Sequence, residues 1–324
     1  MSQKIKIGIV GYGNLGKGVE LSINQNEDME LIAIFTRRDP DSLNNPLMRN
    51  IKDIADYKDK IDVMILCGGS ATDLPEQTPE IAKMFNTVDS FDTHANIPIH
   101  YDNVDKVGKE KGTLNLISSG WDPGLFSMQR IIGESILPVG NTYTFWGEGV
   151  SQGHSDAIRR IDGVLDGKQY TVPIEKALEK VRSGENPEFT TREKHLRVCY
   201  VVAKEGEDLE RIENEIKTMP NYFDEYDTEV NFITKEELEK NHSGMPHGGY
   251  VLRTGQSETG SKQRIEFVLE LESNPEFTAS VLVAYARAVK KMHNNGENGC
   301  ITVFDVPLGM LSPKSPSELR KEIL

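Results

Sequence analysis

Three glycines near the start of the chain restrict its possible folds more than any other feature. In "KIKIGIVGYGNLG", Gly11, Gly13 and Gly16 have the spacing G-x-G-x-x-G directly after a strand-like stretch, and helical spacing follows in residues 14–25. The first glycine permits a tight turn, the second lets the backbone approach a pyrophosphate, and the third lets helix and strand pack closely. The spacing predicts a dinucleotide-binding unit; the alternative is a strand–helix turn that binds no ligand.

Strand-like and helical segments continue to alternate up to about residue 120. The predicted strands are 29–35, 57–69, 86–92 and 113–120, and the predicted helices include 78–85 and 99–112. This alternation is typical of parallel βαβ units with right-handed crossovers. We therefore expect an α/β fold with a Rossmann-type, doubly wound parallel sheet in residues 1–120.

The pattern changes after about residue 120. Strand-like segments lie at 143–156, 168–175, 194–204 and 227–234, and helices such as 208–219 lie between them. This mixture predicts a second, α+β domain in residues 121–270. The helical pattern of residues 277–296 ends at Gly296, and we expect the C-terminal segment, about 271–324, to return to the first domain.

The charge balance limits the partners of this chain. Its 324 residues include 37 Lys and Arg and 51 Asp and Glu, a net charge of −14, and no long basic stretch offers a nucleic-acid surface. No apolar run approaches the ~20 residues that span a bilayer, and the first residues lack the features of a secretion signal. The cysteines, Cys67, Cys199 and Cys300, are few and separated, which is typical of a reducing compartment. We expect a cytoplasmic protein that binds a small molecule, and neither nucleic acid nor a membrane.

The segment "IFTRRD", residues 34–39, bears on the cofactor. An acid at the end of the second strand would bind both ribose hydroxyls of NAD and repel a 2′-phosphate. This chain instead has Thr36, Arg37 and Arg38, and the two guanidinium groups match a phosphate dianion. Asp39 complicates the prediction, because a shift of one position in the strand end would bring it close. These residues favour NADP over NAD; the alternative for the two arginines is a solvated turn.

Polar residues also follow the later strands of the predicted sheet. They are "GGSATD" at 68–73, then Asp92, and then "GWDPG" at 120–124. Ligands of open α/β sheets bind beyond the carboxyl ends of the strands, so these groups are predicted to converge on one crevice. Ordinary turn chemistry is the alternative, although it explains Trp121 beside Asp122 poorly.

Two glycine-spaced segments stand out in the second domain. The first, 145–156, joins an aromatic pair to Gln152, His154 and Asp156, and the second, 242–249, carries His242 and His247. Glycines beside polar and aromatic groups often mark the close approach of a ligand. The histidines lack a third ligand at a useful spacing, so no metal site is predicted. For His242 a flexible surface loop is the alternative.

Arg197 is predicted to point inward, because strand alternation places it on one face with Cys199 and Val201. A buried arginine needs an anionic partner. From spacing alone this partner is either a structural carboxylate of the chain or the carboxylate of a substrate.

Several motifs together resemble one known family. They are "VGYGNLG", "IFTRR", "GSATD", "SFDTH", "SSGWDPG", "TFWGEGVSQGHSDAIRR", "TMPNYF", "SGMPHGG" and "NPEFTAS". In this order, from residue 7 to about 280, they closely resemble meso-diaminopimelate dehydrogenase. The resemblance implies a cytoplasmic homodimer that uses NADP for the reversible oxidative deamination of the D-centre of meso-2,6-diaminopimelate. The product would be L-2-amino-6-oxopimelate, which cyclises to tetrahydrodipicolinate, with release of ammonia, in lysine and cell-wall precursor synthesis.

The resemblance also implies roles for individual residues. Asp92 and Asp122 would hold the ammonium group at the reacting centre and are the candidates for catalytic residues. The implied substrate-binding residues are Asp92, Trp121, Asp122, Trp146, Gln152, Gly153, Asp156, Thr171, Arg197, His247 and Asn274. The implied cofactor-binding residues are Gly11, Tyr12, Gly13, Asn14, Leu15, Gly16, Thr36, Arg37, Arg38, Cys67, Gly68, Gly69, Ser70, Ala71, Thr72, Ser90, Phe91, Asp92, Ser119, Gly120, Trp121, Asp122 and Pro123. Residues 121–270 would also form the dimer contact.

Two other functions stay open at this stage. The first is an oxidoreductase of the same architecture that acts on another amino acid, an aldehyde or a hydroxy acid. The second is a protein that senses NADP without catalysis. The first has no need for two acids beside a tryptophan together with Arg197, and the second predicts tight cofactor binding without turnover of any diaminopimelate isomer.

Overall fold

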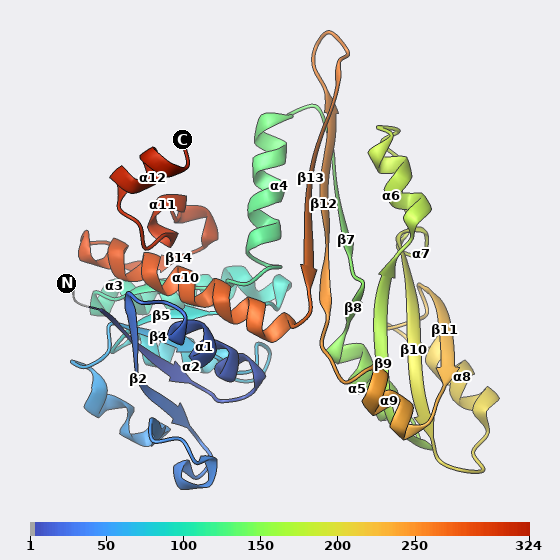
Figure 1. Cartoon of the computed structure of the whole chain (residues 1–324), viewed down its shortest axis with the longest axis horizontal. Helices are drawn as coiled ribbons and strands as arrows, with labels where there is room; N and C mark the ends of the chain where they lie inside the picture. Colours follow the sequence, from blue (N-terminus) through green and yellow to red (C-terminus); the bar gives the residue numbers. More distant parts are fainter. Residues whose placement is uncertain (1–3) are drawn as a thin grey trace. The chain divides into compact units, whose positions relative to one another are not determined.

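The computed structural model describes residues 4–324, which form two compact units (Figure 1). The first unit runs from the start of the described chain to Met128 and resumes from Pro275 to Leu324. The second unit is Gln129–Asn274. The assignment of cofactor binding, substrate binding and dimerisation to separate domains stays a prediction.

The first unit is built on a seven-stranded parallel sheet in the order β14-β6-β5-β4-β1-β2-β3. Its strands are β1 (Ile5–Val10), β2 (Met29–Thr36), β3 (Met48–Asn50), β4 (Val63–Leu66), β5 (Asn86–Asp89), β6 (Leu114–Leu116) and β14 (Gly299–Ile301). The strand order reverses direction between β1 and β4, as in a doubly wound sheet. The predicted Rossmann-type α/β fold is therefore confirmed.

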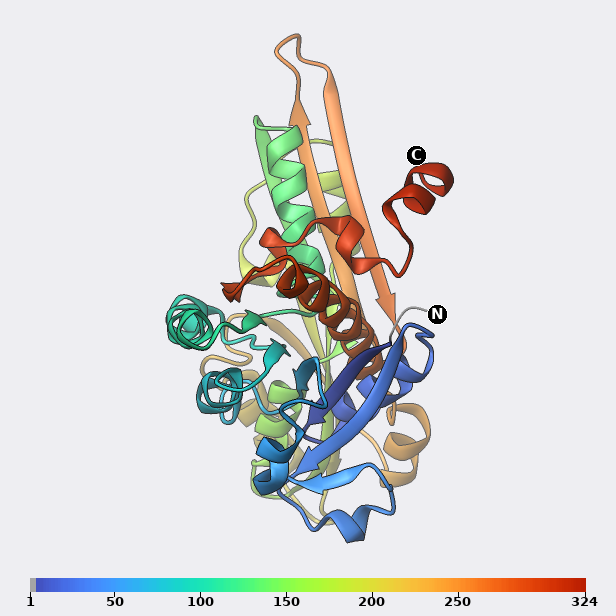
Figure 2. The same ribbon diagram turned by 90° about the vertical axis from the view of Figure 1, so that its left-hand side faces the viewer.

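Helices cover both faces of this sheet (Figures 1 and 2). On one face, α1 (Asn14–Asn24) and α10 (Asn274–Asn294) pack against apolar side chains of β1, β2, β4, β5 and β6. On the other face lie α2 (Leu74–Ala82) and α3 (Ile97–Lys111). Because both faces are covered, the central strands are apolar without interruption, as in "IGIV" and "VMIL". Short helices complete the unit: η1 (Pro40–Leu43), η2 (Ile51–Tyr57), η3 (His94–Asn96), η4 (Val303–Asp305), α11 (Leu308–Leu311) and α12 (Pro316–Glu322).

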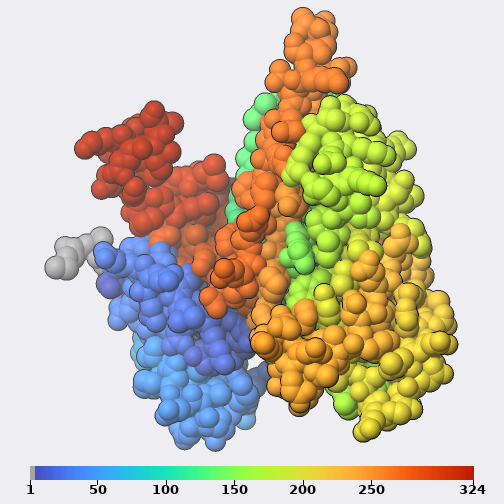
Figure 3. Space-filling view, turned by 45° about the vertical axis from the view of Figure 1, so that its right-hand side comes forward, coloured from blue at the N-terminus to red at the C-terminus, as the bar shows by residue number. Residues whose placement is uncertain are grey.

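The second unit contains two smaller sheets. One has the order β11-β10-β9-β8 and consists of β8 (Gly149–Val150), β9 (Val164–Pro173), β10 (His195–Ala203) and β11 (Asp227–Phe232). The other has the order β13-β12-β7 and consists of β7 (Gly140–Trp146), β12 (His247–Gln256) and β13 (Lys262–Leu271). The turn between β12 and β13 projects from this unit (Figure 3). Its helices are α5 (Gln152–Arg159), α6 (Glu175–Arg182), α7 (Thr191–Lys194), α8 (Leu209–Lys217), α9 (Lys235–Asn241) and most of α4 (Leu125–Ile136).

One local prediction for this unit was wrong in part. Residues 143–156 are predicted to be strand-like, and β7 and β8 do occupy 143–146 and 149–150, but the helix α5 begins at Gln152. Ala157 and Ile158 at the end of α5 are buried, and this eight-residue helix is too short to show its period in the sequence. His242 directly follows α9, and its ring stacks on Tyr200 and bonds to the Tyr170 hydroxyl at 2.9 Å, which argues against the alternative of a flexible surface loop.

Candidate active site

A cavity of about 350 Å³ opens beyond the carboxyl ends of β1, β2 and β4. It lies where the strand order reverses, the place at which open α/β sheets bind ligands. Nine of the residues predicted to bind the cofactor line it: Gly11, Tyr12, Gly13, Thr36, Arg37, Arg38, Cys67, Gly68 and Gly69.

The geometry of the glycine loop fits a pyrophosphate. Gly11 has φ +93°, a left-handed conformation that favours glycine. A Cβ atom on Gly16 would lie 2.1 Å from the Gly11 carbonyl oxygen, so only glycine allows this helix–strand contact. A Cβ atom on Gly13 would meet no atom within 4 Å and would project into open space at the start of α1. Gly13 is the N-cap of α1 and has no side chain to cap the helix, whose N-terminal N–H groups can therefore bind an anion.

Thr36, Arg37 and Arg38 line the same cavity at the carboxyl end of β2. Thr36 is buried, and its hydroxyl oxygen accepts a hydrogen bond from the Arg38 backbone N–H at 3.1 Å. The Arg38 guanidinium donates to the Tyr12 carbonyl oxygen at 2.6 Å. Asp39 does not line the cavity; its carboxylate instead caps the helix η1 by accepting the Asp41 N–H at 3.2 Å.

Two further polar residues, Asp73 and Gln77, line the same cavity. Asp73 ends the segment 68–73 that was predicted to lie at this crevice, although it is not among the implied cofactor-binding residues, and sequence reasoning missed Gln77. The Asp73 carboxylate lies 2.9 Å from Nη1 of Arg37 and accepts the Gly69 N–H at 2.9 Å. The Gly69 hydrogen bond, followed by Arg37, holds the pKa of this carboxyl below its usual range. The Gln77 carbonyl oxygen is buried without a hydrogen-bond partner among residues 4–324. An unpaired buried acceptor is costly, and a ligand that donates a hydrogen bond would satisfy it.

The candidate acids of the first unit follow adjacent strands of the sheet. Asp92 comes three residues after the end of β5, is exposed, and donates its backbone N–H to the Ser70 hydroxyl at 2.8 Å. Asp122 follows β6 and is half-buried, next to Trp121, whose ring lies edge-on to Phe126 at 5.1 Å. Since β5 and β6 pair in parallel, both acids lie at the carboxyl edge of the sheet.

The other residues predicted to bind the cofactor lie along the same edge or at the start of α1. Ser70, Ala71 and Thr72 follow β4, and Ser90 and Phe91 follow β5. The hydroxyl oxygen of Ser119, after β6, is buried without a hydrogen-bond partner in the described chain. Asn14, Leu15 and Gly16 begin α1, and Gly120 and Pro123 flank Trp121 and Asp122.

Arg197 is the central polar residue of the second unit. It lies on β10, is 6% exposed, and pairs in register with Thr171 of β9, whose hydroxyl accepts a hydrogen bond from its guanidinium. The Tyr226 ring lies 3.8 Å from the guanidinium carbon. No carboxylate of residues 4–324 forms an ion pair with Arg197, and its Nε is buried without a hydrogen-bond partner. Burial lowers the pKa of Arg197. Of the two partners considered from the sequence, the structural carboxylate is therefore not present in the described chain.

His247 and Asn274 lie close to this row of residues. Thr171 pairs in register with Gly149, and a Cβ atom on Gly149 would lie 2.6 Å from the His247 ring. The Asn274 N–H donates to the Met245 carbonyl oxygen at 3.0 Å, two positions before His247. The sheet pairing thus connects Arg197, Thr171 and His247 through Gly149.

Trp146 ends the strand β7, and its backbone N–H donates to Nε2 of His195 at 2.9 Å. His195 is 3% exposed; burial, and then the charges of Lys194 and Arg197, lower its pKa to about 3. The Lys194 ammonium lies 5.7 Å from the centre of the Trp146 ring. Neither His195 nor Lys194 was singled out from the sequence, because only the pairing of distant strands brings them to Trp146.

The remaining candidates of the second unit lie on α5. Gln152 and Gly153 begin this helix and are exposed, and Asp156 forms an ion pair with Arg159. His154 accepts or donates a 2.7 Å hydrogen bond with the Ser151 hydroxyl. Burial, and then the charge of Arg197, lower the pKa of His154 to about 4, so its ring is neutral at pH 7.

Residues 4–324 contain no group of three or more His, Cys, Asp or Glu side chains arranged to hold a metal ion. None of the helices in this part of the chain is both long and apolar enough to cross a membrane.

Known proteins are similar to this chain over nearly its full length. The model of the diaminopimelic acid dehydrogenase C-terminal domain matches residues 120–273. Meso-diaminopimelate D-dehydrogenase of Ureibacillus thermosphaericus is 64% identical over 324 residues, 99% of each chain. The structure of a meso-diaminopimelate dehydrogenase mutant of Clostridium tetani E88 with DAP is 61% identical, with a TM-score of 0.94 over 99% of this chain and 100% of that chain. An engineered D-amino acid dehydrogenase bound to NADP+ is 43% identical, with a TM-score of 0.86 over the same shares. This chain therefore belongs to the meso-diaminopimelate D-dehydrogenase family, whose members are amino-acid dehydrogenases and thus oxidoreductases.

Proposed function

We propose that this protein uses NADP+ to oxidise the D-centre of meso-2,6-diaminopimelate. The products would be L-2-amino-6-oxopimelate, which cyclises to tetrahydrodipicolinate, ammonia and NADPH, and the reaction would be reversible. The observation that carries the proposal is the buried Arg197, which has no carboxylate partner in the described chain although the family acts on an amino acid with two carboxylates. Reductive amination in the reverse direction would feed lysine and cell-wall precursor synthesis.

The cavity beyond β1, β2 and β4 supports NADP as the cofactor. Gly11, Gly13 and Gly16 would receive the pyrophosphate, and Thr36, Arg37 and Arg38 would receive the 2′-phosphate. Asp39 lies outside the cavity, so no acid is placed at the end of β2 to bind the ribose hydroxyls of NAD. The NADP+ in the engineered D-amino acid dehydrogenase, whose chain is 43% identical, is consistent with this choice. The remaining predicted cofactor residues, after β4, β5 and β6, would face the nicotinamide half.

The substrate carries an ammonium and a carboxylate at each end, and we propose separate groups of residues for them. In the first unit, Asp92 and Asp122 would hold the ammonium of the D-centre, beside Trp121. In the second unit, Arg197 and Thr171 would bind the distal carboxylate, and His247 and Asn274 would bind the distal L-centre. Trp146, Gln152, Gly153 and Asp156 are the further residues proposed to contact substrate.

Bound NADP+ supplies the hydride acceptor. The hydride leaves the D-centre carbon while the nitrogen lone pair forms the C=N bond, so the ammonium must first lose a proton. Asp92 and Asp122 are proposed to bind this nitrogen and to hold the reacting carbon in a near-attack alignment. Water then adds to the iminium carbon, and ammonia leaves as the carbonyl forms.

We further propose that the protein is a cytoplasmic homodimer that binds neither nucleic acid nor a membrane. Its three cysteines are free thiols, which suits a reducing compartment. Three exposed apolar residues of the second unit, Ile132 (38%), Ile136 (62%) and Val139 (63%), lie on or directly after α4 and offer a surface for a second copy. The net charge of −14 opposes binding to nucleic acid.

The decisive experiment follows NADPH absorbance at alkaline pH with each diaminopimelate isomer in turn. We expect the meso isomer to be oxidised and the L,L isomer, which has no D-centre, to be inert. An absence of NADPH with the meso isomer would contradict the proposal. Tight NADP binding without turnover on any isomer would indicate a sensor, and turnover only on an aldehyde or hydroxy acid would indicate a different dehydrogenase.

A further inference from the structure

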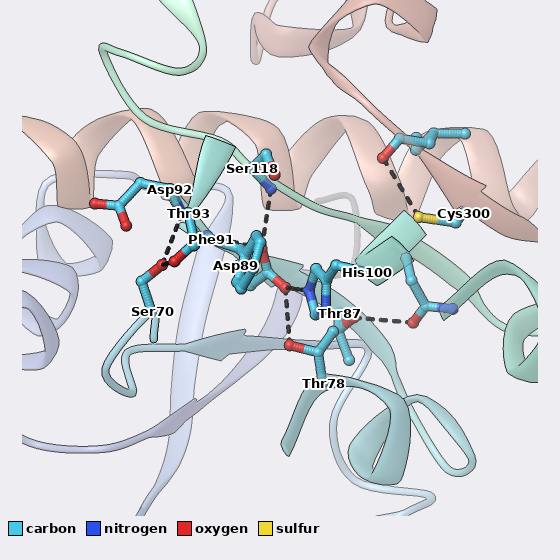
Figure 4. Close-up of polar contacts among 12 residues, drawn as sticks. Ser70, Thr78, Thr87, Asp89, Phe91, Asp92, Thr93, His100, Ser118 and Cys300 are labelled. Carbon is cyan, nitrogen blue, oxygen red and sulfur yellow. Dashed lines mark hydrogen bonds and ion pairs between the residues drawn. The ribbon is translucent and has the colours of Figure 1, made fainter. Parts of the chain in front are cut away.

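Asp89 and His100 form a buried pair next to the segments that carry the two candidate acids (Figure 4). Asp89 ends β5 and His100 lies on α3, and their exposed fractions are 0% and 3%. Nε2 of His100 lies 2.9 Å from Oδ2 of Asp89. Neither residue lines the cofactor cavity, and the proposed chemistry does not use either of them.

The Asp89 carboxylate accepts hydrogen bonds from four other residues. Oδ1 accepts the backbone N–H of Phe91 at 3.0 Å and of Ser118 at 2.9 Å. Oδ2 accepts the Thr78 hydroxyl at 2.8 Å in addition to His100. The two backbone N–H groups and the Thr78 hydroxyl donate to the carboxylate, and an N–H on Nε2 of His100 would complete this set of donors. One buried side chain thus joins α2, α3 and the segments that follow β5 and β6.

The hydrogen bond to Ser118 holds a strained turn. Ser118 has φ 56°, the left-handed region that residues other than glycine adopt at a cost. Its N–H bonds to the Asp89 carboxylate, and the next N–H, of Ser119, bonds to the Asp89 carbonyl oxygen at 3.0 Å. This turn leads directly into Trp121 and Asp122.

The same pair also fixes the segment that carries Asp92. The His100 ring stacks on the Phe91 ring, with centroids 4.2 Å apart and planes at 24°. Phe91 is 1% exposed and directly precedes Asp92, whose N–H bonds to Ser70 (Figure 4). Asp89 and His100 therefore fix the backbone that directly precedes each of the two candidate acids.

We propose that Asp89 and His100 are positioning residues for the dehydrogenase reaction: the hydrogen bond from His100 to Asp89 holds the Phe91–Asp92 and Ser118–Asp122 segments where the two acids meet the reacting amine. This inference rests on the proposed function, which assigns Asp92 and Asp122 to that amine. If this is correct, activity requires the N–H that His100 donates to Asp89, and it does not require the bulk of the His100 ring.

Two substitutions of His100 separate these features. His100→Gln keeps an N–H near the position of Nε2 but loses the ring, and His100→Phe keeps a ring over Phe91 but loses the donor. We expect His100→Phe to lower kcat with meso-diaminopimelate on the order of 10- to 100-fold, because misplacement of a reacting group by about 1 Å costs that much. The dissociation constant of NADP+ should rise much less than kcat falls, because the glycine loop and Thr36, Arg37 and Arg38 keep their contacts even though the displaced segments also face the proposed nicotinamide half. His100→Gln should stay within about 3-fold of the unsubstituted protein in kcat.

The control is His293→Phe, which makes the same change on α10, where the His293 ring lies 3.3 Å from the Glu297 carbonyl oxygen, outside the cofactor cavity and the two segments of the candidate acids. It should leave kcat unchanged. The inference is overturned if His100→Phe keeps full kcat, if His100→Gln loses as much as His100→Phe, or if the NADP+ dissociation constant rises as much as kcat falls.

Thr78 provides a second, independent test if His100→Phe does not fold. Thr78→Val removes the donor to Asp89 at nearly constant volume, and Thr78→Ser keeps it. We expect kcat to fall with valine and to be retained with serine, and the reverse order would contradict the inference. The unsubstituted protein is assayed in parallel: without its turnover of meso-diaminopimelate the proposed function fails, whereas normal turnover with no donor dependence rejects only the role of Asp89 and His100.

Discussion

The guanidinium of Arg37 lies 2.9 Å from the carboxylate of Asp73, at the cavity proposed for the cofactor. The Arg37 side chain is 73% exposed, and an ion pair so exposed to water contributes at most about 1 kcal/mol to stability. The arginine is therefore held near the cavity by a weak interaction that a phosphate dianion can replace.

Arg37→Ala should therefore change cofactor affinity much more than stability. The loss of a charged hydrogen bond to the 2′-phosphate should raise the KM for NADP+ about 10- to 100-fold, while the KM for NAD+ changes little. Steady-state kinetics with both cofactors, and thermal unfolding without them, measure the two effects. Arg192→Ala, which breaks the similarly exposed pair with Asp227, is the matched control and should change neither KM. Equal rises in both KM values would rule out contact with a 2′-phosphate.

Two glycines of the cofactor loop should respond differently to alanine. Gly13→Ala meets no atom within 4 Å, so the protein should fold normally but lose NADP+ affinity about 10-fold as the methyl group enters the pyrophosphate space. Gly16→Ala places its methyl group 2.1 Å from the Gly11 carbonyl oxygen and should lower the free energy of unfolding by about 1–3 kcal/mol. Urea unfolding and NADP+ titration distinguish the two, and a destabilised Gly13→Ala would contradict this account of the loop.

Arg197→Leu should lower activity and raise stability. Removal of the proposed carboxylate partner should raise the KM for meso-diaminopimelate on the order of 10- to 100-fold. Because Arg197 is buried without an acidic partner in the described chain, its removal should stabilise the free protein by about 1 kcal/mol. Initial rates and thermal unfolding without substrate test both parts, and a large loss of stability would show that Arg197 is structural.

His195 should make the protein less stable in acid. The pKa of His195 is about 3 in the folded chain and about 6.5 in the unfolded chain. Between these two values the ring binds a proton in the unfolded state but stays neutral in the folded state. The free energy of unfolding therefore falls as the pH drops from 6.5 towards 3, by about 2 kcal/mol at pH 5 from this residue. His195→Gln keeps an acceptor for the Trp146 N–H but does not titrate. Urea unfolding at pH 7 and pH 5 should show a loss about 2 kcal/mol smaller in this variant, and equal losses would contradict the assignment.

Ile136→Lys tests the proposed dimer surface on α4. Ile136 is 62% exposed in the single chain, so a lysine there should not affect folding but should oppose contact with a second apolar surface. We expect light scattering to show a dimer for the unsubstituted protein and a monomer for the variant. Ile99→Lys changes an equally exposed isoleucine on α3, also 62%, and should leave the dimer intact. A dimer that survives Ile136→Lys would place the contact elsewhere.

Much of the first unit could be predicted from the sequence because its signals lie in residues that are close together in the chain. Gly11, Gly13 and Gly16 follow a strand and open a helix within one short stretch. Asp92 and Asp122 were placed at one sheet edge from the rule that parallel strands end on the same side. The helix α5 was missed because eight residues with an exposed Gly153 show too few turns for their period to be recognised.

The sequence by itself determined the doubly wound fold and the glycine loop, because adjacent residues carry these signals, and it is the source of the proposal that Thr36, Arg37 and Arg38 bind a phosphate. Only the tertiary structure decided which distant side chains meet. Asp73 reaches Arg37, His195 holds the Trp146 backbone, and Asp89 gathers donors from α2, α3 and the segment after β6. Such contacts depend on strand register and on which way each helix faces the sheet, and a shift of one residue in a strand turns every side chain to the opposite face.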